Sequence, residues 1–364
     1  MIDNISEICE RVRVPATLHQ NWIGRGAQVD KGSRSPAMTD VARLAGVSHQ
    51  TVSRVLNDHP NVKEQTRIRV RAAIAELGYR PNRAARALVT GRSQLIGVVA
   101  RNSTLFGPAT MLSEFEQAAA DAGFAVSVGS VRELDRSSIS AVVDRHLDQR
   151  VAGLVVIANT ASATEALAEI PEDLPVVFID GDPASGRPLV TVDQVAGARA
   201  ATRHLLDAGH ETVWHVSGPT DWFDSAGRIQ GWRQTLEEAG AEVPPLLSAD
   251  WSAAEGYRTG QMLARMPEVT AIFTANDHLA LGILRALHER GRRVPHDVSV
   301  VGFDDVPEAA YFIPPLTTVR QAFGDVARAA LSLLLGQMRD DSGMADQIVV
   351  PPQLIVRESA PRRI

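Results

Sequence analysis

The sequence predicts a molecule of two parts, an all-α segment near its front and a larger α/β domain, and three observations support this. The 364 residues are 45% hydrophobic and 22% charged, which suits a globular chain long enough for two or three domains. Short helical patterns end at Gly91, and from Gln94 onward apolar strands alternate with amphipathic helices. The charge changes at the same place, because residues 38–92 carry ten Lys/Arg and four Asp/Glu within a chain of net charge −6.

The all-α segment is predicted to hold three helices and a short fourth one over residues 82–89. Gly46 suits the left-handed turn after a first helix, and the Ser48 hydroxyl can cap a second helix that buries Val52 and Val55. Gly78 ends the third helix in the same way as Gly46 ends the first. The local excess of basic residues is the footprint expected of phosphate binding, although solvated helix faces also carry arginines.

The α/β domain is predicted from β-branched apolar strands that helices separate. Such strands indicate parallel sheets covered on both faces, and the number of units exceeds one open sheet, so two sheets are expected. Ligands bind such folds beyond the carboxyl ends of the strands. The predicted strands are 95–100, 125–129, 153–157, 176–180, 190–193, 213–217, 271–274 and 298–303, and the predicted helices include 110–122, 195–208, 225–239 and 277–290.

Residues 42–55 have the spacing of a helix-turn-helix. A small residue lets the first helix approach the second, glycine permits the turn, and two valines on the second helix face the core. The opposite face can read DNA, since Gln pairs with adenine, Arg pairs with guanine and hydroxyls reach phosphates. The alternative is a helical hairpin whose Gln50 and Arg54 are only solvated. The predicted DNA contacts here are Thr39, Ser48, His49, Gln50, Thr51, Ser53, Arg54 and Asn57.

The segments "TDVARLAGVSHQTVSRVLN" and "LGYRPNRAARAL" resemble the DNA-binding headpiece of the LacI/GalR family of bacterial transcriptional regulators. The resemblance continues in order through "GHETVWHVSGP", "RIQGW", "DWSAAEGY", "ANDHLALG", "VSVVGFDD" and "YFIPPLTTVRQ". It implies an all-α helix-turn-helix headpiece followed by an α/β two-lobed domain like that of periplasmic binding proteins. The expected divisions are a disordered extension or over-long start at 1–37, the headpiece at 38–81, a hinge helix at 82–92, and an effector-binding and dimerisation domain at 93–364.

The resemblance implies a homodimer on operator DNA, with recognition helices in the major groove and hinge helices in the central minor groove. The hinge helix has about two turns, which is too short to persist alone, so it is expected to order against its twin and DNA. Leu88 occupies the position that wedges between base pairs in the family, although it could instead be a core leucine. We expect Leu88→Ala to weaken operator binding in a gel-shift titration of a folded protein. The hinge contacts are Asn82, Arg83, Ala85, Arg86 and Leu88.

The resemblance also implies an effector cleft between two lobes, with chain crossovers near Val192, Arg320 and Val350. Sugar recognition needs planar polar side chains for pairs of hydroxyls and an apolar or aromatic surface for the ring. Asp180 could instead end a strand and cap a turn, and Trp251 could be core. The expected effector residues are Arg101, Leu105, Pro108, Asp180, Val192, Arg228, Trp251, Asn276 and Asp304.

Together the patterns predict a cytoplasmic repressor of sugar-utilisation genes. Its affinity for operator DNA is expected to be controlled by a small sugar or glycoside, and a galactoside is one candidate. Effector that bridges the lobes would favour one inter-lobe orientation and so alter how the paired hinge helices dock. The alternatives are a purine- or phosphosugar-responsive regulator of the same family, a sugar-binding protein without DNA, and an enzyme.

Several function classes lack their expected sequence signals. No glycine-rich phosphate loop ending in Lys-Ser/Thr, G-x-S-x-G elbow or H-E-x-x-H pair is present, so we expect no enzyme. Cys9 is the only cysteine, which excludes an internal disulfide framework and a thiolate metal site. We therefore expect neither metal nor cofactor, and no apolar run approaches the roughly 20 residues of a membrane span.

Overall fold

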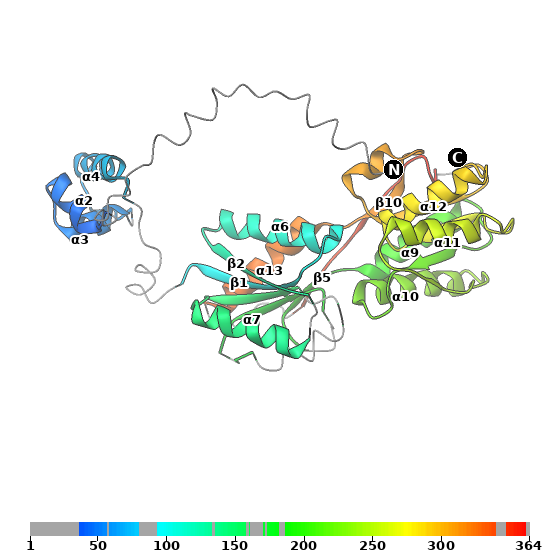
Figure 1. Cartoon of the computed structure of the whole chain (residues 1–364), viewed down its shortest axis with the longest axis horizontal. Helices are drawn as coiled ribbons and strands as arrows, with labels where there is room; N and C mark the ends of the chain where they lie inside the picture. The colour runs from blue at the N-terminus through cyan, green and yellow to red at the C-terminus, as the bar shows by residue number, and fades with distance from the viewer. Residues whose placement is uncertain are drawn as a thin grey trace, which may run out of the picture. The chain divides into compact units, whose positions relative to one another are not determined.

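The computed structural model forms two compact units, Met1–Arg86 and Ala87–Ile364 (Figure 1). Within the described residues, no helix is long and apolar enough to cross a membrane. The structure describes residues 36–56, 58–79, 93–132, 135–157, 160, 170–171, 173–181, 186–339 and 347–361.

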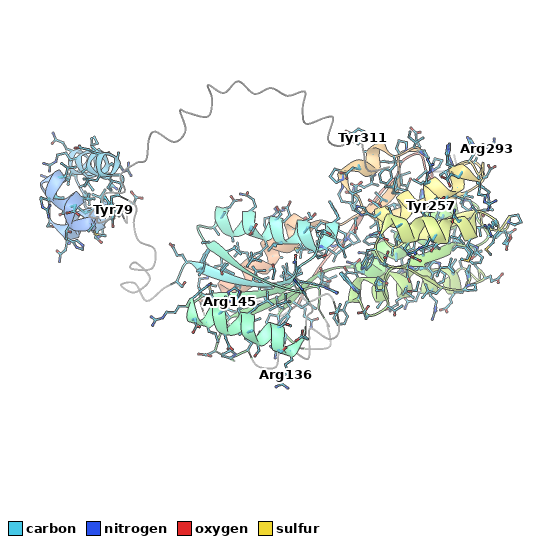
Figure 2. All side chains as sticks on the ribbon, in the orientation of Figure 1. Tyr79, Arg136, Arg145, Tyr257, Arg293 and Tyr311 are labelled. Atoms are coloured by element: carbon cyan, nitrogen blue, oxygen red, sulfur yellow. The ribbon has the colours of Figure 1, made fainter. Side chains whose placement is uncertain are left out.

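The first unit is a headpiece of three helices, α2 (Met38–Ala45), α3 (His49–Leu56) and α4 (Glu64–Leu77). Val41, Val52 and Val70 form its core, which the buried ring of Tyr79 completes (Figure 2). The predicted turns are confirmed, because Gly46 and Gly78 follow α2 and α4 with φ of +63° and +61°. The predicted cap is also confirmed, since the Ser48 Oγ accepts a hydrogen bond of 3.2 Å from the Thr51 amide. The helix predicted over residues 82–89 lies outside the described residues.

The N-lobe of the second unit is built on a six-stranded parallel sheet in the order β11-β5-β4-β3-β1-β2. Two helices, α6 (Phe106–Asp121) and α13 (Phe323–Gln337), share an apolar core with one face of this sheet, and α7 (Arg136–Asp148) covers the other face (Figure 1). The strands are β1 (Leu95–Arg101), β2 (Ala125–Val131), β3 (Gly153–Ile157), β4 (Val176–Ile179), β5 (Leu189–Val192) and β11 (Gln347–Val350).

The C-lobe is built on a second six-stranded sheet in the order β12-β10-β9-β8-β6-β7. One face packs on α9 (Gln194–Asp207) and α10 (Phe223–Glu238), and the other on α11 (Ala253–Leu263) and α12 (Asp277–Glu289). A short 3₁₀ helix, η4, follows β9 at Pro307–Tyr311. The strands are β6 (Trp214–Ser217), β7 (Leu247–Ser248), β8 (Ala271–Thr274), β9 (Ser299–Asp304), β10 (Thr317–Arg320) and β12 (Gln353–Ile355).

The predicted pair of helix-covered sheets is confirmed, with one difference in strand direction. β12 runs antiparallel to β10, with Gln353 paired to Arg320, whereas the other strand pairs of the C-lobe sheet are parallel. The cause is the route of the chain. β12 follows β11 after two residues and enters the C-lobe from the side on which its other strands end, so it must run away from that side.

The chain passes between the lobes three times, after β5, after β10 and after β11. These strands end at Val192, Arg320 and Val350, which confirms the three predicted crossovers. The carboxyl ends of both parallel sheets therefore face the junction of the lobes, where such folds bind ligands.

Candidate functional site

Helix α3 of the headpiece has one buried face and one polar face. Val52 and Val55 are buried, while His49, Gln50 and Arg54 are exposed. The polar face thus holds the two side-chain types that pair with purines in the major groove. Of the other predicted contacts, Thr39 and Ser48 are exposed, Thr51 and Ser53 are half-buried, and Asn57, Asn82, Arg83, Ala85, Arg86 and Leu88 lie outside the described residues.

Arg228 on α10 occupies the junction between the lobes and is only 2% exposed. Its Nε donates to the Gln194 Oε1 at 2.9 Å, and its Nη1 donates to the carbonyl of Ala275. The guanidinium carbon lies 3.8 Å from the centre of the Phe303 ring, within the range of a cation–π contact. Contacts from three parts of the C-lobe therefore hold this guanidinium in one orientation.

Two carboxyl groups flank the guanidinium, and a third, that of Asp180, interacts with it electrostatically. The Asp304 Oδ1 lies 3.9 Å and the Asp224 Oδ2 4.0 Å from the Arg228 Nη2. Asp304 ends β9 and accepts a hydrogen bond of 2.7 Å from Gln321. Asp180 follows β4 in the N-lobe and accepts one of 3.0 Å from the Thr191 hydroxyl.

Burial makes these acids hard to ionise. It raises the pKa of Asp304 to about 6, even though the Arg228 charge opposes the shift. Burial and the neighbouring Asp224 carboxyl raise the pKa of Asp180 to about 8, and burial also raises the pKa of Asp224. The φ of Asp180, +54°, lies in the left-handed region that aspartate tolerates in turns, whereas that of Asp304, +110°, is a strained value of the kind that clusters at functional sites.

Two tryptophans form the aromatic part of the site. Trp251 is 8% exposed and meets Trp222 edge to face, with ring centres 5.3 Å apart. The guanidinium carbon of Arg101, from the N-lobe, lies 5.9 Å from the Trp222 ring centre. Trp222 also forms an antiparallel β-bridge with Thr160 of the N-lobe. The lobes therefore meet on Trp222, which sequence reasoning missed.

Trp251 has the core role that the sequence left open, and its N–H group suits the predicted ligand contact. Its ring belongs to the C-lobe core and packs over Gly218, where a β-carbon would collide with it. Its indole N–H is nevertheless buried without a hydrogen-bond partner among the described residues. A buried donor without an acceptor is costly, and it suits a bound group that can accept a hydrogen bond.

Asn276 has a structural task in addition to the predicted one. Its Oδ1 accepts a hydrogen bond of 2.8 Å from the Leu279 amide and so caps α12, while its Nδ2 donates to the Trp251 carbonyl at 3.1 Å. Both ends of the amide therefore have one protein partner each, which leaves the second N–H and the second lone pair of the oxygen for a ligand.

The remaining predicted effector residues belong to the N-lobe. Leu105 precedes α6 and packs against the C-lobe core, and Pro108 lies in the first turn of the same helix. Val192 is 2% exposed and packs in the N-lobe core. The structure thus brings Arg101, Leu105 and the C-lobe aromatics to one junction.

Sequence reasoning also missed Gln194, Asp224, Phe303 and Gln321. Asp224 had a usable signal, because it lies four residues before Arg228 and so on the same face of α10. Gln194 and Gln321 follow two of the crossovers and bond to each other at 2.9 Å. Only the fold reveals that pairing.

The comparisons with known proteins agree with this architecture. Residues 37–82 match the bacterial regulatory proteins of the lacI family, and residues 202–360 match the periplasmic binding protein-like domain. The chain is 34% identical over 325 residues to the lactose operon repressor of Escherichia coli (strain K12), covering 88% of this chain and 89% of that one.

Solved structures extend the likeness to three dimensions. The lac repressor dimer bound to operator and the anti-inducer ONPF has a TM-score of 0.81 and 32% identity, covering 90% of this chain and 100% of that one. The complex of the transcriptional regulator CelR with cellobiose has a TM-score of 0.66 and 31% identity, covering 89% and 99%. The chain belongs to the lacI family of bacterial regulatory proteins, as its sequence motifs predicted.

Proposed function

We propose that this protein is a cytoplasmic repressor that binds operator DNA as a homodimer and whose affinity for DNA is controlled by a small sugar or glycoside. The observation that carries the proposal is the fixed Arg228 guanidinium, which lies at the junction of the lobes between the Asp224 and Asp304 carboxyl groups and near the Trp251 ring. Paired hydrogen-bonding groups next to an indole face are the means by which proteins hold a pyranose ring.

The DNA-binding half of the proposal rests on α3. Gln50 and Arg54 on its exposed face would read base edges, and Ser48 and Thr51 would hold phosphates. The lac repressor structure with operator, at 32% identity, supports this assignment.

A purine effector is less well supported than a sugar. A flat purine needs aromatic stacking from both lobes, and the N-lobe offers chiefly Phe106. That ring already packs edge to face on Phe323, with ring centres 6.1 Å apart.

The test is a ligand panel followed by a gel shift. The protein is titrated with lactose, cellobiose, common monosaccharides, their 6-phosphates and free purines. Binding is followed by intrinsic tryptophan fluorescence, because Trp222 and Trp251 lie at the site and their emission should change. We expect a neutral sugar to change both the emission and the affinity for operator DNA. Binding by purines alone, or a sugar that binds without any effect on the gel shift, would contradict the proposal.

A further inference from the structure

The charges at the inter-lobe site do not balance. Asp224 and Asp304 flank one guanidinium, that of Arg228, and the buried Asp180 interacts electrostatically with both Asp224 and Arg228. Burial is the main cause of the raised pKa values of all three acids, and the single Arg228 cation does not offset it. The site as built therefore favours hydrogen-bond donors and disfavours further negative charge.

Asp224 differs from the other two acids in its partners. Asp180 and Asp304 each accept a hydrogen bond from a neighbouring side chain, Thr191 and Gln321. Among the described residues, Asp224 accepts none, and its nearest partner is the Arg228 Nη2 at 4.0 Å, beyond hydrogen-bond distance. Its carboxyl group is 17% exposed, so it is largely removed from water and still lacks a donor.

A second unpartnered group lies near the same guanidinium. The Trp251 indole N–H is buried without an acceptor, and its ring centre is 5.6 Å from the Arg228 guanidinium carbon. A ligand that satisfies both Asp224 and Trp251 must present both a hydrogen-bond donor and a hydrogen-bond acceptor. Hydroxyl groups of a sugar do both.

We propose that Asp224 is a specificity-determining residue of the effector site, which accepts a hydrogen bond from a hydroxyl or amino group of the sugar and excludes ligands that bring a carboxylate or phosphate there. The proposal rests on the proposed function, since it names the chemical class of the sugar. Asp224 projects from the first turn of α10, two residues after Trp222, and so lies where the two lobes meet.

The experiment compares probes that share one ring and differ in charge. Galactose, galactosamine, galacturonate and galactose 6-phosphate are titrated against the tryptophan fluorescence of the full-length protein, and the matching glucose series is run beside them. The variants are Asp224→Asn, which removes the charge and keeps the shape, and Asp224→Ser. The control is Asp221→Asn, three residues earlier and exposed.

We expect the unaltered protein to bind a neutral sugar at least about tenfold more tightly than its 6-phosphate, because apposed like charges in a buried site are strongly unfavourable. Asp224→Asn should reduce that ratio by about tenfold, and Asp221→Asn should leave it unchanged. If the donor is an ammonium group, galactosamine or glucosamine binds more tightly than the parent sugar, and Asp224→Asn abolishes the preference. If it is a hydroxyl, the amino and parent sugars bind alike and Asp224→Asn weakens both.

The opposite results are equally clear. A ratio that Asp224→Asn and Asp224→Ser both leave unchanged, in proteins with the melting temperature of the unaltered chain, overturns the role of Asp224 and leaves the proposed function standing. Tight binding of the phosphorylated sugars by the unaltered protein would also overturn the role of Asp224 and leave the proposed function standing. If no sugar of either series, nor lactose or cellobiose, binds at all, the proposed function fails and this inference falls with it.

Discussion

Arg228 holds the inter-lobe site together in addition to the ligand contact proposed for it. A guanidinium this deeply buried is tolerated because Gln194, the Ala275 carbonyl and the flanking acids replace its water. Its loss would leave buried carboxylates without a cation, so function and stability at this position are linked.

The first prediction concerns Arg228→Ala. We expect the variant to lose its response to sugar and to unfold with a free energy lower by about 3 kcal/mol, because an uncompensated charge remains buried. Fluorescence titration and chemical denaturation measure the two effects. The control is Arg285→Ala, which removes an exposed ion pair with Glu289 and should change stability by less than about 1 kcal/mol. A stable variant that still responds to sugar would contradict the role assigned to Arg228.

The second prediction concerns the loss of folding stability at acid pH, to which the buried His215 contributes. Burial, with a smaller effect from the Arg228 charge, lowers the pKa of His215 to about 3, from the ordinary value of 6.5. Between pH 3 and 6.5 the unfolded chain therefore binds more protons, so this contribution to stability is fully present above pH 6.5 and is lost on acidification, by up to about 1.4 kcal/mol per pH unit.

His215→Phe should flatten that loss, because phenylalanine can keep the stacking against Phe273, whose ring centre lies 4.6 Å away, and cannot take up a proton. Urea denaturation at a series of pH values between 4 and 7 measures it. The control is His296→Phe at an exposed position, which should retain the slope of the unaltered protein. An identical slope in His215→Phe would show that other groups dominate the acid transition.

At the residue level, the sequence predicted those site residues whose side-chain chemistry by itself suggests sugar binding. Arg228, Asp304 and Trp251 lie within motifs, and the structure brings them together. Gln194 and Trp222 could not be predicted, because their importance depends on which segment of the other lobe or crossover lies against them.

At the scale of elements, α11 and α12 show how glycine sets a helix spacing. A β-carbon on Gly282 of α12 would meet the backbone of Ala253 and Tyr257 in α11, so the two helices approach without intervening side chains. Tyr257 adds a bond across the pair by donating to the Glu289 carboxylate at 2.5 Å (Figure 2).

The third prediction follows from that contact. Gly282→Ala should destabilise the protein by about 1–3 kcal/mol, because the added methyl forces two backbones apart. Gly107→Ala is the matched control within a helix. Its β-carbon would meet only the Phe323 ring at 3.9 Å, so the higher helix propensity of alanine should stabilise the protein by about 0.5–1 kcal/mol. Thermal unfolding measures both, and equal effects of the two substitutions would contradict the close approach of α11 and α12.

The elements that the sequence failed to predict share a physical cause. The strands concerned are β7, β10, β11 and β12. β7, β10 and β12 carry at most two apolar residues each and β11 is a largely exposed edge strand, so none shows the buried apolar run of the equally short β4 and β8. α6 begins at Phe106 instead of residue 110, because Pro108 is tolerated in a first helical turn, where its missing N–H has no partner to lose.

For the whole molecule, the division into two compact units leads to the fourth prediction. The described residues of the inter-lobe site all belong to the unit Ala87–Ile364. A protein reduced to residues 93–364 should bind the sugar with an affinity within about threefold of the full chain and should give no gel shift with operator DNA. Fluorescence titration and electrophoresis test the two statements. A shortened protein that is folded by circular dichroism and fails to bind sugar would contradict them.

The three crossovers also have a consequence for the order in which the chain is synthesised. The N-lobe core needs α13, which supplies Val326, Ala330 and Leu334, and its sheet ends in β11, yet the ribosome makes both after most of the C-lobe. The C-lobe sheet is likewise complete only after β12 has been synthesised. Neither lobe can be completed while the rest of the protein is still being translated, and a premature stop just before Phe323 would leave both unfinished.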